Sequence, residues 1–538
     1  MPQGSALTKS PPQRASAKRR QNSPIMPAKR SISGQRKPGS NDSASATLDP
    51  ASMQTRFEEM EAELQQYRKV LAAKDDELRD HLSFCQQTIC HLVSEKSRQE
   101  NRAARDNYLR NVQRLGWASA VRSGMHVHDV WNEGAAFRDI RQKQKALDLR
   151  KKQLEEEKRD LAKVRPVKNK KRSEGAADDG FSRPSGTARS LKSRLSEQDY
   201  AVKLEIIQLN LITIKTEEEG IKAQLNMLLR ERNLHLREMK RITDEDNAKY
   251  RDLPNRLSER YLLCSLLGKG GFSEVYKAYD LREHRYVACK VHQLNSSWSD
   301  AKKQNYIKHA TREYEIHRSL KHESVVEMHD VFEIDANSFC TVLEYCPGQD
   351  LDFLLKQEHR LPERDARNKI VQIVNALKYL NSVEPPVIHY DLKPANVLLR
   401  HGMVKITDFG LSKQVRDSDS DGNVDLTSQG AGTYWYLPPE CFVIGSALPK
   451  ISSKVDVWSV GVIFYQSLYG EKPFGHNLSQ QSLLQNNVIL NAREVRFPEK
   501  PKVSEEAKNF IRRCLTYDMR ARPDVLTLSE DPYMRKRT

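Results

Sequence analysis

The stretch "VIHYDLKPANVLL", residues 387–399, places three chemically distinct side chains at short, fixed spacing: Asp391, Lys393 and Asn396. A carboxylate can accept or orient a hydroxyl proton, a lysine can lie near a transferring phosphoryl group, and an amide oxygen can bind a metal ion. These are the groups that in-line phosphoryl transfer requires. The stretch therefore predicts a catalytic loop, and the question is whether the remaining parts of such a site lie around it.

A glycine-containing turn lies upstream, in "LLGKGGFSEVYKA", residues 266–278. Gly268 and Gly270 remove side chains where backbone N–H groups must approach phosphates, and Ser273 takes the position of a usual third glycine. This motif alone is weak evidence. It gains specificity because Val275 and then the strand "VACK", residues 287–290, follow it.

The strand and the segments after it supply candidates for holding a nucleotide. Lys290 is predicted to contact the α- and β-phosphates, and Ala288 to leave space for the adenine. In "HATREYEIHRSL", residues 309–320, Glu313 is the predicted partner of Lys290, and Glu315 is predicted to lie on the surface. In "TVLEYCPGQDL", residues 341–351, we expect the adenine to contact the side chain of Leu343 and the backbone of Glu344 and Cys346.

Two motifs further along the chain complete the series expected of a phosphoryl-transfer site. Asp408 in "ITDFG" is the predicted main Mg²⁺ ligand with Asn396, since hard oxygen ligands and phosphates suit this ion. In "GAGTYWYLPPE", residues 430–440, Thr433 is predicted to bridge Asp391 and Lys393, which favours a serine or threonine acceptor. Glu440 is expected to pair with Arg522 of "RARPD". Single motifs arise by chance, but six in this order do not.

Residues 261–533 resemble a eukaryotic protein kinase, and the closer resemblance is to the Tousled-like kinases. It rests on "VHQLNSSWSDAKKQNYIKHATREYEIHRSLKHESVV", "IHYDLKPANVLL" and "GAGTYWYLPPECF", with helical and basic segments upstream. The resemblance implies a two-lobed α+β kinase fold, ATP and Mg²⁺ as cofactors, nuclear localisation, autophosphorylation and self-association, including association with paralogues. It also implies histone H3–H4 chaperones as substrates and a role in chromatin assembly and DNA replication.

The N-terminal half reads as helices joined by basic linkers. Residues 1–50 are predicted to be a disordered basic tail and 165–195 a basic linker, with the clusters "AKRRQNSP", "PAKRS" and "VKNKKRS" typical of nuclear import signals. Residues 53–115 show apolar residues spaced by threes and fours, with a stutter after Leu78, and predict a coiled coil. Residues 136–164 are mostly charged and predict an exposed helix or weak coil.

The clearest heptad pattern lies at 200–245, where two interleaved apolar rows predict an oligomerising coiled coil. The alternative is one amphipathic helix lying on the kinase domain. The first row contains Leu204, Leu211 and Leu225, and the second Ile207, Ile214, Ile221 and Leu228.

The composition restricts the class of protein and the kinds of partner that these predictions allow. Charged residues make up 30% of the 538 residues, and the net charge of +17 favours acidic or polyanionic partners. No apolar run approaches the length of a membrane span, and the eight cysteines form no C-x-x-C pair, so we expect a soluble intracellular protein with free thiols. Direct contact with nucleic acid is conceivable, but no aromatic residues interleave the basic clusters.

Two rival functions remain. The first is a coiled-coil pseudokinase scaffold that binds nuclear partners and nucleotide without phosphoryl transfer. Such scaffolds normally lack one of Lys290, Asp391, Asn396 or Asp408, and all four are present here. The second is bare nucleic-acid binding by the basic N-terminal region.

Tyr390 precedes Asp391 where most protein kinases carry an arginine that pairs with a phosphate on the activation segment. Tyrosine brings no positive charge, and the segment at 413–430 is already acidic. It contains four residues available for modification: Ser418, Ser420, Thr427 and Ser428. The sequence therefore predicts activation by helix-driven association, with segment phosphorylation tuning the activity.

Overall fold

The structure is a computed structural model, and it describes most of the chain between residues 50 and 535. The described residues are 50–123, 126–164, 196–295, 297–415, 424–425, 432–443 and 450–535. The predicted tail, apart from Pro50, and the predicted linker 165–195 lie outside them, as do the four modification candidates of the activation segment. The chain divides into two compact units, Met1–Asp80 and His81–Thr538.

The first helix, α1 (Pro50–Arg114), begins in the first unit and ends in the second. Its apolar residues in the first unit are exposed, and the predicted seam faces solvent. The exposed set includes Met53, Phe57, Met60, Leu64, Tyr67, Leu71 and Leu78. Pairing of this seam with another helix stays a prediction.

A β-hairpin that sequence reasoning did not predict follows α1. Strands β1 (Gly116–Ser123) and β2 (His126–Glu133) pair antiparallel along their full length. Gly116 is required at the start, because its φ is +119° and a Cβ there would lie 1.9 Å from the Asn132 carbonyl oxygen. His126 and His128 lie on β2, and no metal-binding cluster of His, Cys, Asp and Glu occurs among the described residues.

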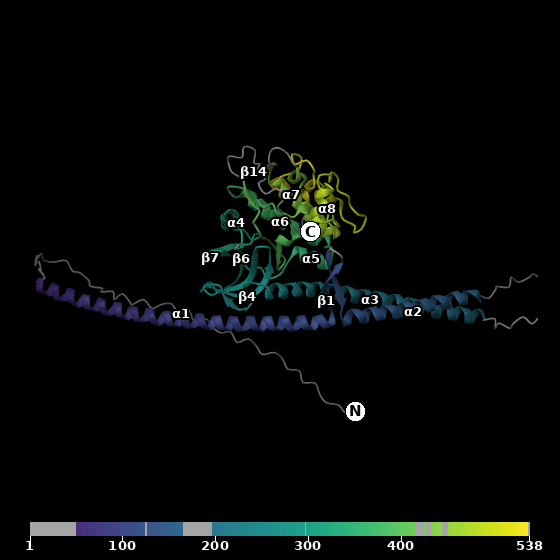
Figure 1. The fold of residues 1–538 in the computed structure, drawn as a ribbon, viewed down its shortest axis with the longest axis horizontal. Coiled ribbons are helices and arrows are strands. Elements are labelled where there is room, and N and C mark those ends of the chain that lie inside the picture. The colour runs from purple at the N-terminus through teal and green to yellow at the C-terminus, as the bar shows by residue number, and fades with distance from the viewer. Residues whose placement is uncertain are drawn as a thin grey trace, which may run out of the picture. The chain divides into compact units, whose positions relative to one another are not determined.

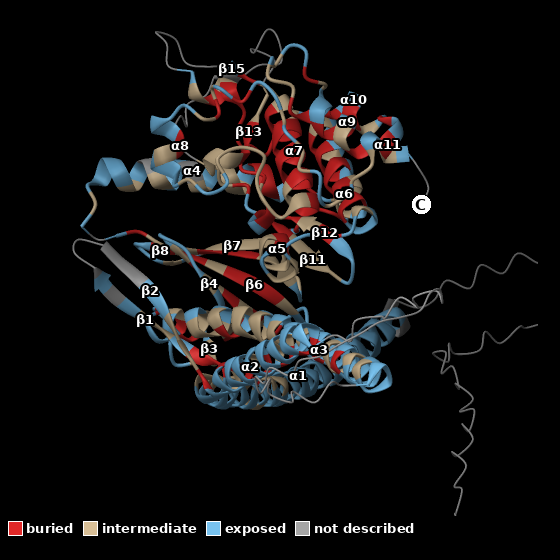
Figure 2. Cartoon of the chain, turned by 90° about the vertical axis from the view of Figure 1, so that its right-hand side faces the viewer, coloured by how far each residue is buried: buried red, intermediate tan, exposed pale blue. Residues whose placement is uncertain are grey.

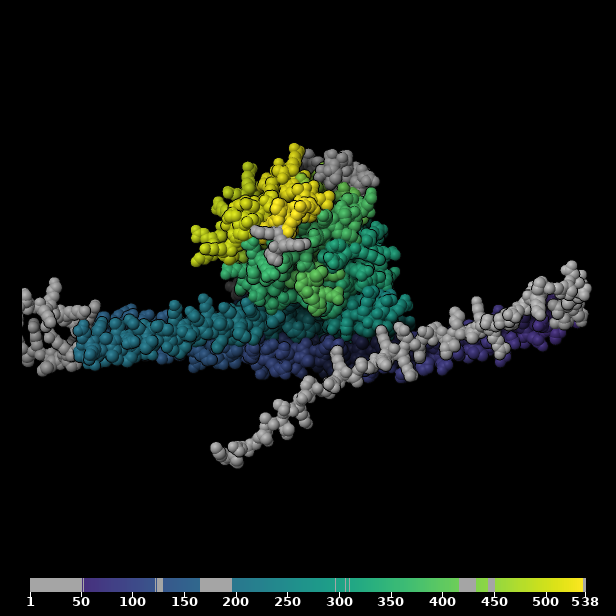
Figure 3. Space-filling model, turned by 180° about the vertical axis from the view of Figure 1, so that it is seen from behind, coloured from purple at the N-terminus to yellow at the C-terminus, as the bar shows by residue number. Residues whose placement is uncertain are grey.

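Helices α2 (Ala135–Lys163) and α3 (Glu197–Asp246) lie side by side (Figures 1 and 3). Leu147 and Leu154 of α2 pack against Ile214 of α3, and Lys151 forms an ion pair with Glu218 at 2.7 Å. Part of the α3 seam that was predicted to join separate chains is therefore covered by α2 of the same chain. The many charged residues of α2 had predicted an exposed helix. The buried residues of α2 are mostly seven residues apart: Phe137, Ile140, Leu147, Leu154 and Leu161.

A six-stranded antiparallel sheet forms the smaller lobe of the C-terminal domain, in the order β3-β4-β5-β6-β8-β7. Its helix is α4 (Asp300–Arg318), capped at its start by the Ser299 side chain. The strands are β3 (Asn255–Arg256), β4 (Tyr261–Lys269), β5 (Ser273–Asp280), β6 (Arg285–Gln293), β7 (Met328–Asp335) and β8 (Ser338–Glu344).

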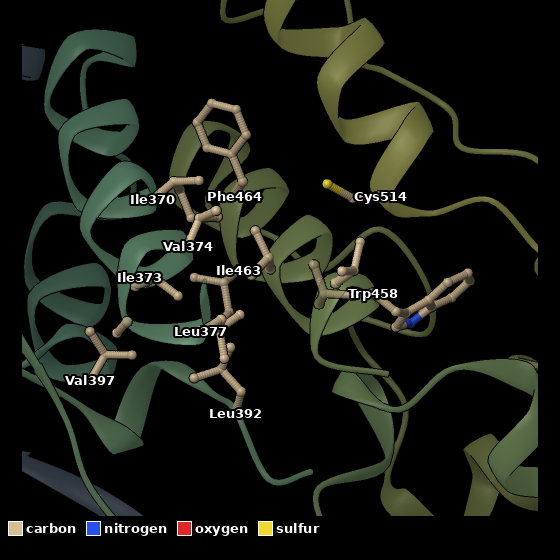
Figure 4. Packing of buried hydrophobic residues seen from close by; sticks show 14 of the residues in the cluster. Ile370, Ile373, Val374, Leu377, Leu392, Val397, Trp458, Ile463, Phe464 and Cys514 are labelled. Atoms are coloured by element: carbon tan, nitrogen blue, oxygen red, sulfur yellow. The ribbon is translucent and has the colours of Figure 1, made fainter. Parts of the chain in front are cut away.

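The larger lobe is mainly helical, and many of its buried residues lie on α6 and α7 (Figure 2). Figure 4 shows Ile370, Val374 and Leu377 of α6 facing Ile463 and Phe464 of α7. The helices are α5 (Leu351–Glu358), α6 (Glu363–Ser382), α7 (Lys454–Tyr469), α8 (Gln480–Gln485), α9 (Glu505–Cys514), α10 (Val525–Ser529) and α11 (Pro532–Arg535), with the short turns η1 (Pro394–Asn396), η2 (Tyr434–Tyr436) and η3 (Pro439–Phe442). The strands are β9 (Gln349–Asp350), β10 (Val387–Ile388), β11 (Val397–Arg400), β12 (Met403–Ile406), β13 (Lys413–Gln414), β14 (Val424–Asp425) and β15 (Lys450–Ile451).

The N-terminal helices contact both lobes within the second unit. Ser97 of α1 donates a 2.8 Å hydrogen bond to the Cys264 carbonyl on β4. Arg237 of α3 lies 3.4 Å from the Asp350 carboxylate and stacks over the Phe353 ring at 4.4 Å. The fold is thus the α+β kinase fold with a sheet-rich lobe and a helical lobe, and helices lie against it. None of the helices in the described ranges has the length and apolarity that crossing a membrane demands.

Candidate active site

Lys290 lies on β6 and contacts two carboxylates at once. Its ammonium is 3.2 Å from Glu313 on α4 and 3.3 Å from Asp408. Burial opposes the charge of this lysine, but the two carboxylates outweigh that cost and raise its pKa above the usual value. The structure thus pairs Lys290 with Glu313, and Glu315 is exposed outside this pair, as predicted.

The register of the sheet brings the predicted nucleotide contacts together. Val275 on β5 is the cross-strand partner of Lys290, and Ala288 is the partner of Leu343. A Cβ at Gly268 would meet none of the described atoms within 4 Å, so protein packing does not require this glycine. The free space above the turn instead suits the approach of a ligand to the backbone.

Glu344 presents only its backbone to the cleft. Its carboxylate forms ion pairs with Arg400 at 2.8 Å and Lys405 at 2.7 Å in the larger lobe. Cys346, two residues later, is partly buried, and burial raises the pKa of its thiol to about 11. The thiol therefore stays protonated at neutral pH, and this segment has no free charge to offer a purine.

Phe409 fixes the position of α4 and hence of Glu313. Its buried ring lies 4.6 Å from the His317 ring on α4 and 5.1 Å from the His389 ring before the catalytic loop. His317 donates to the Val326 carbonyl at 2.6 Å, and burial lowers its pKa to about 4, so it is neutral. This packing connects the catalytic loop, Asp408 and α4 in one rigid arrangement.

The catalytic loop holds its polar groups in mutual contact. Lys393 lies 2.7 Å from the Asp391 carboxylate and 3.1 Å from the Thr433 hydroxyl, which in turn donates to Asp391 at 3.4 Å. Asn396 donates to the Asp391 backbone carbonyl at 2.9 Å. The bridging position of Thr433 matches the geometry expected from the sequence.

Asp456 is a positioning residue whose target the sequence did not reveal. Its fully buried carboxylate accepts hydrogen bonds from the backbone N–H groups of His389, at 2.8 Å, and Tyr390, at 2.9 Å. Burial raises its pKa above the usual value against the pull of these donors. It holds the catalytic loop from beneath through these two backbone contacts.

Two oxygen donors fit a divalent metal bound with phosphates. Because the Asn396 amide nitrogen is bonded to Asp391, its oxygen is left for a ligand. Asp408 stays ionised, since burial opposes its charge but Lys290 outweighs it and holds its pKa below the usual value. A Mg²⁺ ion needs only one or two such protein ligands beside phosphates and water.

Tyr390 is almost completely buried and belongs to an apolar cluster under the activation segment. It packs with Ile388, Leu437, Ile451 and Val455. Its hydroxyl lies beside the Cys441 thiol, and burial raises its pKa well above the usual value. Tyr390 therefore packs as an apolar member of this cluster and brings no positive charge to it.

This packing predicts an asymmetric response to substitution at Tyr390. Tyr390→Phe keeps the ring and is expected to change the unfolding free energy by less than about 1 kcal/mol. Tyr390→Arg buries a charge among apolar side chains and is expected to destabilise by about 3 kcal/mol or more. Urea denaturation of both variants measures the difference, and equal stabilities contradict this role.

Comparison with known proteins agrees with this site. A family model described as "Protein kinase domain" matches residues 261–534. The human serine/threonine-protein kinase tousled-like 1 is 51% identical over 481 residues, covering 85% of this chain and 62% of that protein. Human tousled-like 2 is 50% identical over 488 residues, covering 85% and 63%.

The similarity extends to plants. The Arabidopsis thaliana serine/threonine-protein kinase TOUSLED is 48% identical over 448 residues, covering 83% of this chain and 62% of that protein. The matched share of this chain exceeds the kinase domain, so the resemblance includes helical residues before it. The chain spans a little under two thirds of the length of these relatives.

Proposed function

The chain belongs to the protein kinase family, in its Tousled-like branch, and on this premise we propose that it is an active enzyme that phosphorylates protein serine and threonine residues. The observation that carries the proposal is that one arrangement holds both halves of the site. Lys290 contacts Glu313 and Asp408, while Asp391, Lys393 and Thr433 contact one another.

Each group has a defined role in this reaction. Lys290, held by Glu313, binds the α- and β-phosphates, and Asp408 and Asn396 provide the ligands for Mg²⁺. Asp391 orients the acceptor hydroxyl and takes its proton, and Lys393 stabilises charge on the transferring group. When bound, ATP would supply the γ-phosphoryl group, with ADP as the leaving group, and Mg²⁺ would offset negative charge on the phosphates.

The assay that tests this function follows label from γ-labelled ATP into protein in the presence of Mg²⁺. Wild-type protein is expected to transfer label at least about 100-fold faster than Lys290→Met, because methionine keeps the length of the side chain but loses the cation. Wild-type transfer no faster than that of the variant overturns the proposal. The pseudokinase scaffold predicts that wild type and variant transfer label equally slowly. Nothing in the comparisons supports that alternative.

We further propose that association through the helices promotes autophosphorylation, because it raises the effective concentration of one kinase domain near another. The exposed seam of α1 is available for a second helix, whereas part of the α3 seam is covered by α2. Segment phosphorylation then tunes activity, in keeping with the apolar environment of Tyr390.

Charging the α1 seam is expected to lower the oligomeric mass and autophosphorylation together. The variant is Leu64→Glu with Leu71→Glu, and the matched control is Gln65→Glu with Gln66→Glu on the exposed faces of the same helix. Light scattering gives the mass. An unchanged mass in the seam variant contradicts association through α1.

The cellular setting is also a proposal. The basic clusters near residues 17–24, 27–31 and 167–173 favour nuclear import, and the family resemblance favours histone H3–H4 chaperones as substrates. Phosphorylation of such chaperones, measured with nuclear extract as competitor, tests the substrate assignment.

A further inference from the structure

A cavity of about 610 Å³ opens beside the catalytic loop, on the side where Lys393 and Thr433 lie. Its walls come from α5, from η2 and from the residues after α7, including Lys356, Trp435 and Lys472. Lys393 and Thr433 belong to the cavity wall and contact Asp391 directly, so the opening lies next to the place where an acceptor hydroxyl would reach Asp391. The cavity is therefore placed to receive a neighbouring side chain of the same peptide.

Most polar groups in the cavity wall already have partners. Lys393 binds Asp391, and Lys356 forms an ion pair with Asp352 at 2.6 Å. Gln466 accepts a hydrogen bond from the Tyr436 hydroxyl at 2.7 Å. These groups are committed within the protein.

Lys472 is different. Its ammonium lies 3.9 Å from the centre of the Trp435 ring, and in the described part of the chain no carboxylate lies within ion-pair distance of it. The indole is fixed because its N–H donates to the Gly475 carbonyl at 2.8 Å. Burial lowers the pKa of Lys472, and the negative charge of Asp352 does not offset this.

His476 adds a second donor at the same wall. Its Nδ1 accepts a 3.2 Å hydrogen bond from the Lys472 backbone N–H, which leaves Nε2 as the protonated nitrogen. Both Lys472 and His476 line the cavity. A half-buried cation fixed on an aromatic ring, with a further N–H donor nearby, is suited to bind an anion.

We propose that this cavity is a substrate subsite that binds an acidic side chain close to the phosphoacceptor, with Lys472 as the specificity-determining residue. The inference rests on the proposed kinase function and deepens it, since it names acidic peptides as the preferred substrates. An approaching carboxylate relieves the unpaired charge of Lys472, whereas a lysine or arginine in the cavity is repelled by it.

The experiment uses the full chain and a set of serine peptides in which each flanking position is in turn Glu, Gln, Lys or phosphoserine. At one flanking position or more, Glu is expected to give a kcat/KM at least about tenfold above that of Lys, a difference of about 1.4 kcal/mol. The phosphoserine arm distinguishes a carboxylate preference from a general anion preference.

Variants at position 472 assign the preference to this lysine. Lys472→Glu is expected to reverse the Glu-over-Lys ratio, Lys472→Gln to abolish it and Lys472→Arg to retain it. Lys502→Glu, an exposed change of equal charge outside the cavity, is the matched control and is expected to keep the wild-type ratio.

The outcomes separate the two proposals. If the wild-type chain phosphorylates no peptide or protein, the kinase function itself fails. If it phosphorylates peptides without a Glu-over-Lys preference, or if Lys472→Glu and Lys472→Gln leave that preference unchanged, the function stands and the subsite is overturned.

Discussion

Replacing Asp391 with asparagine is expected to lower kcat by about 10²- to 10⁴-fold while nucleotide affinity stays close to that of the wild type. Asparagine has nearly the same shape but cannot accept the acceptor proton, and general base catalysis contributes about this factor. Lys290 and Asp408 do not contact Asp391 and keep their mutual ion pair, and Asn396 keeps its hydrogen bond to the backbone carbonyl of residue 391.

The measurement pairs steady-state phosphorylation kinetics with fluorescence titration of an ATP analogue. Asp365→Asn, at an exposed position in the first turn of α6, makes the same chemical change away from the cleft and is expected to remain within about twofold of wild type. A variant Asp391→Asn with near-wild-type kcat contradicts the role given to Asp391. A parallel loss of nucleotide binding instead shows that the substitution disturbs the cleft.

Replacing Arg522 with methionine is expected to produce the largest loss of stability, about 3–5 kcal/mol. The Arg522 side chain is fully buried and lies 2.7 Å from the Glu440 carboxylate. It also donates to the carbonyl of Thr516 at 2.9 Å and to that of Lys454 at 3.1 Å. Methionine leaves Glu440 and these carbonyls without their partner in a low-dielectric site.

Urea denaturation of the full chain, followed through the unfolding of the kinase domain, measures this loss. Arg512→Met is the matched control, because Arg512 is half exposed and its nearest carboxylate lies 3.7 Å away on Glu505. We expect the control to lose less than about 1 kcal/mol. Similar losses for both variants contradict the view that the Glu440–Arg522 pair stabilises the larger lobe.

Much of the catalytic site could be predicted because its residues lie in short motifs whose spacing is set by local backbone geometry. The contact of Thr433 with Asp391 and Lys393 followed from the chemistry of the loop, and that of Lys290 with Glu313 from the order of strand and helix. The pair formed by Glu440 and Arg522 was also anticipated, although 82 residues separate the two in sequence.

Other features depend on contacts that a single sequence does not encode locally. A heptad row shows that Ile214 must be buried, but it does not say whether α2 of the same chain or a helix of another chain covers it. The contact of Arg237 with Asp350 likewise joins a helix to a lobe across more than 100 residues, and no motif surrounds Arg237.

The β1–β2 hairpin was missed although a signal was present. The alternating residues on both sides of "SGM", residues 123–125, fit two paired strands joined by a short turn. The contact of Asp456 with the catalytic loop was not predicted for another reason. Asp456 accepts hydrogen bonds from the backbone N–H groups of His389 and Tyr390, and a sequence does not indicate which side chain a backbone N–H group will bond.

The central claim is that this chain is an active serine/threonine kinase, and phosphoamino-acid analysis tests it most directly. The full chain is incubated with γ-labelled ATP, Mg²⁺ and a protein substrate, and the labelled protein is hydrolysed in acid. The account predicts labelled phosphoserine and phosphothreonine from the wild type, with at most about one hundredth of that label from Asp391→Asn. Label confined to phosphotyrosine, or equal label from wild type and variant, would contradict it.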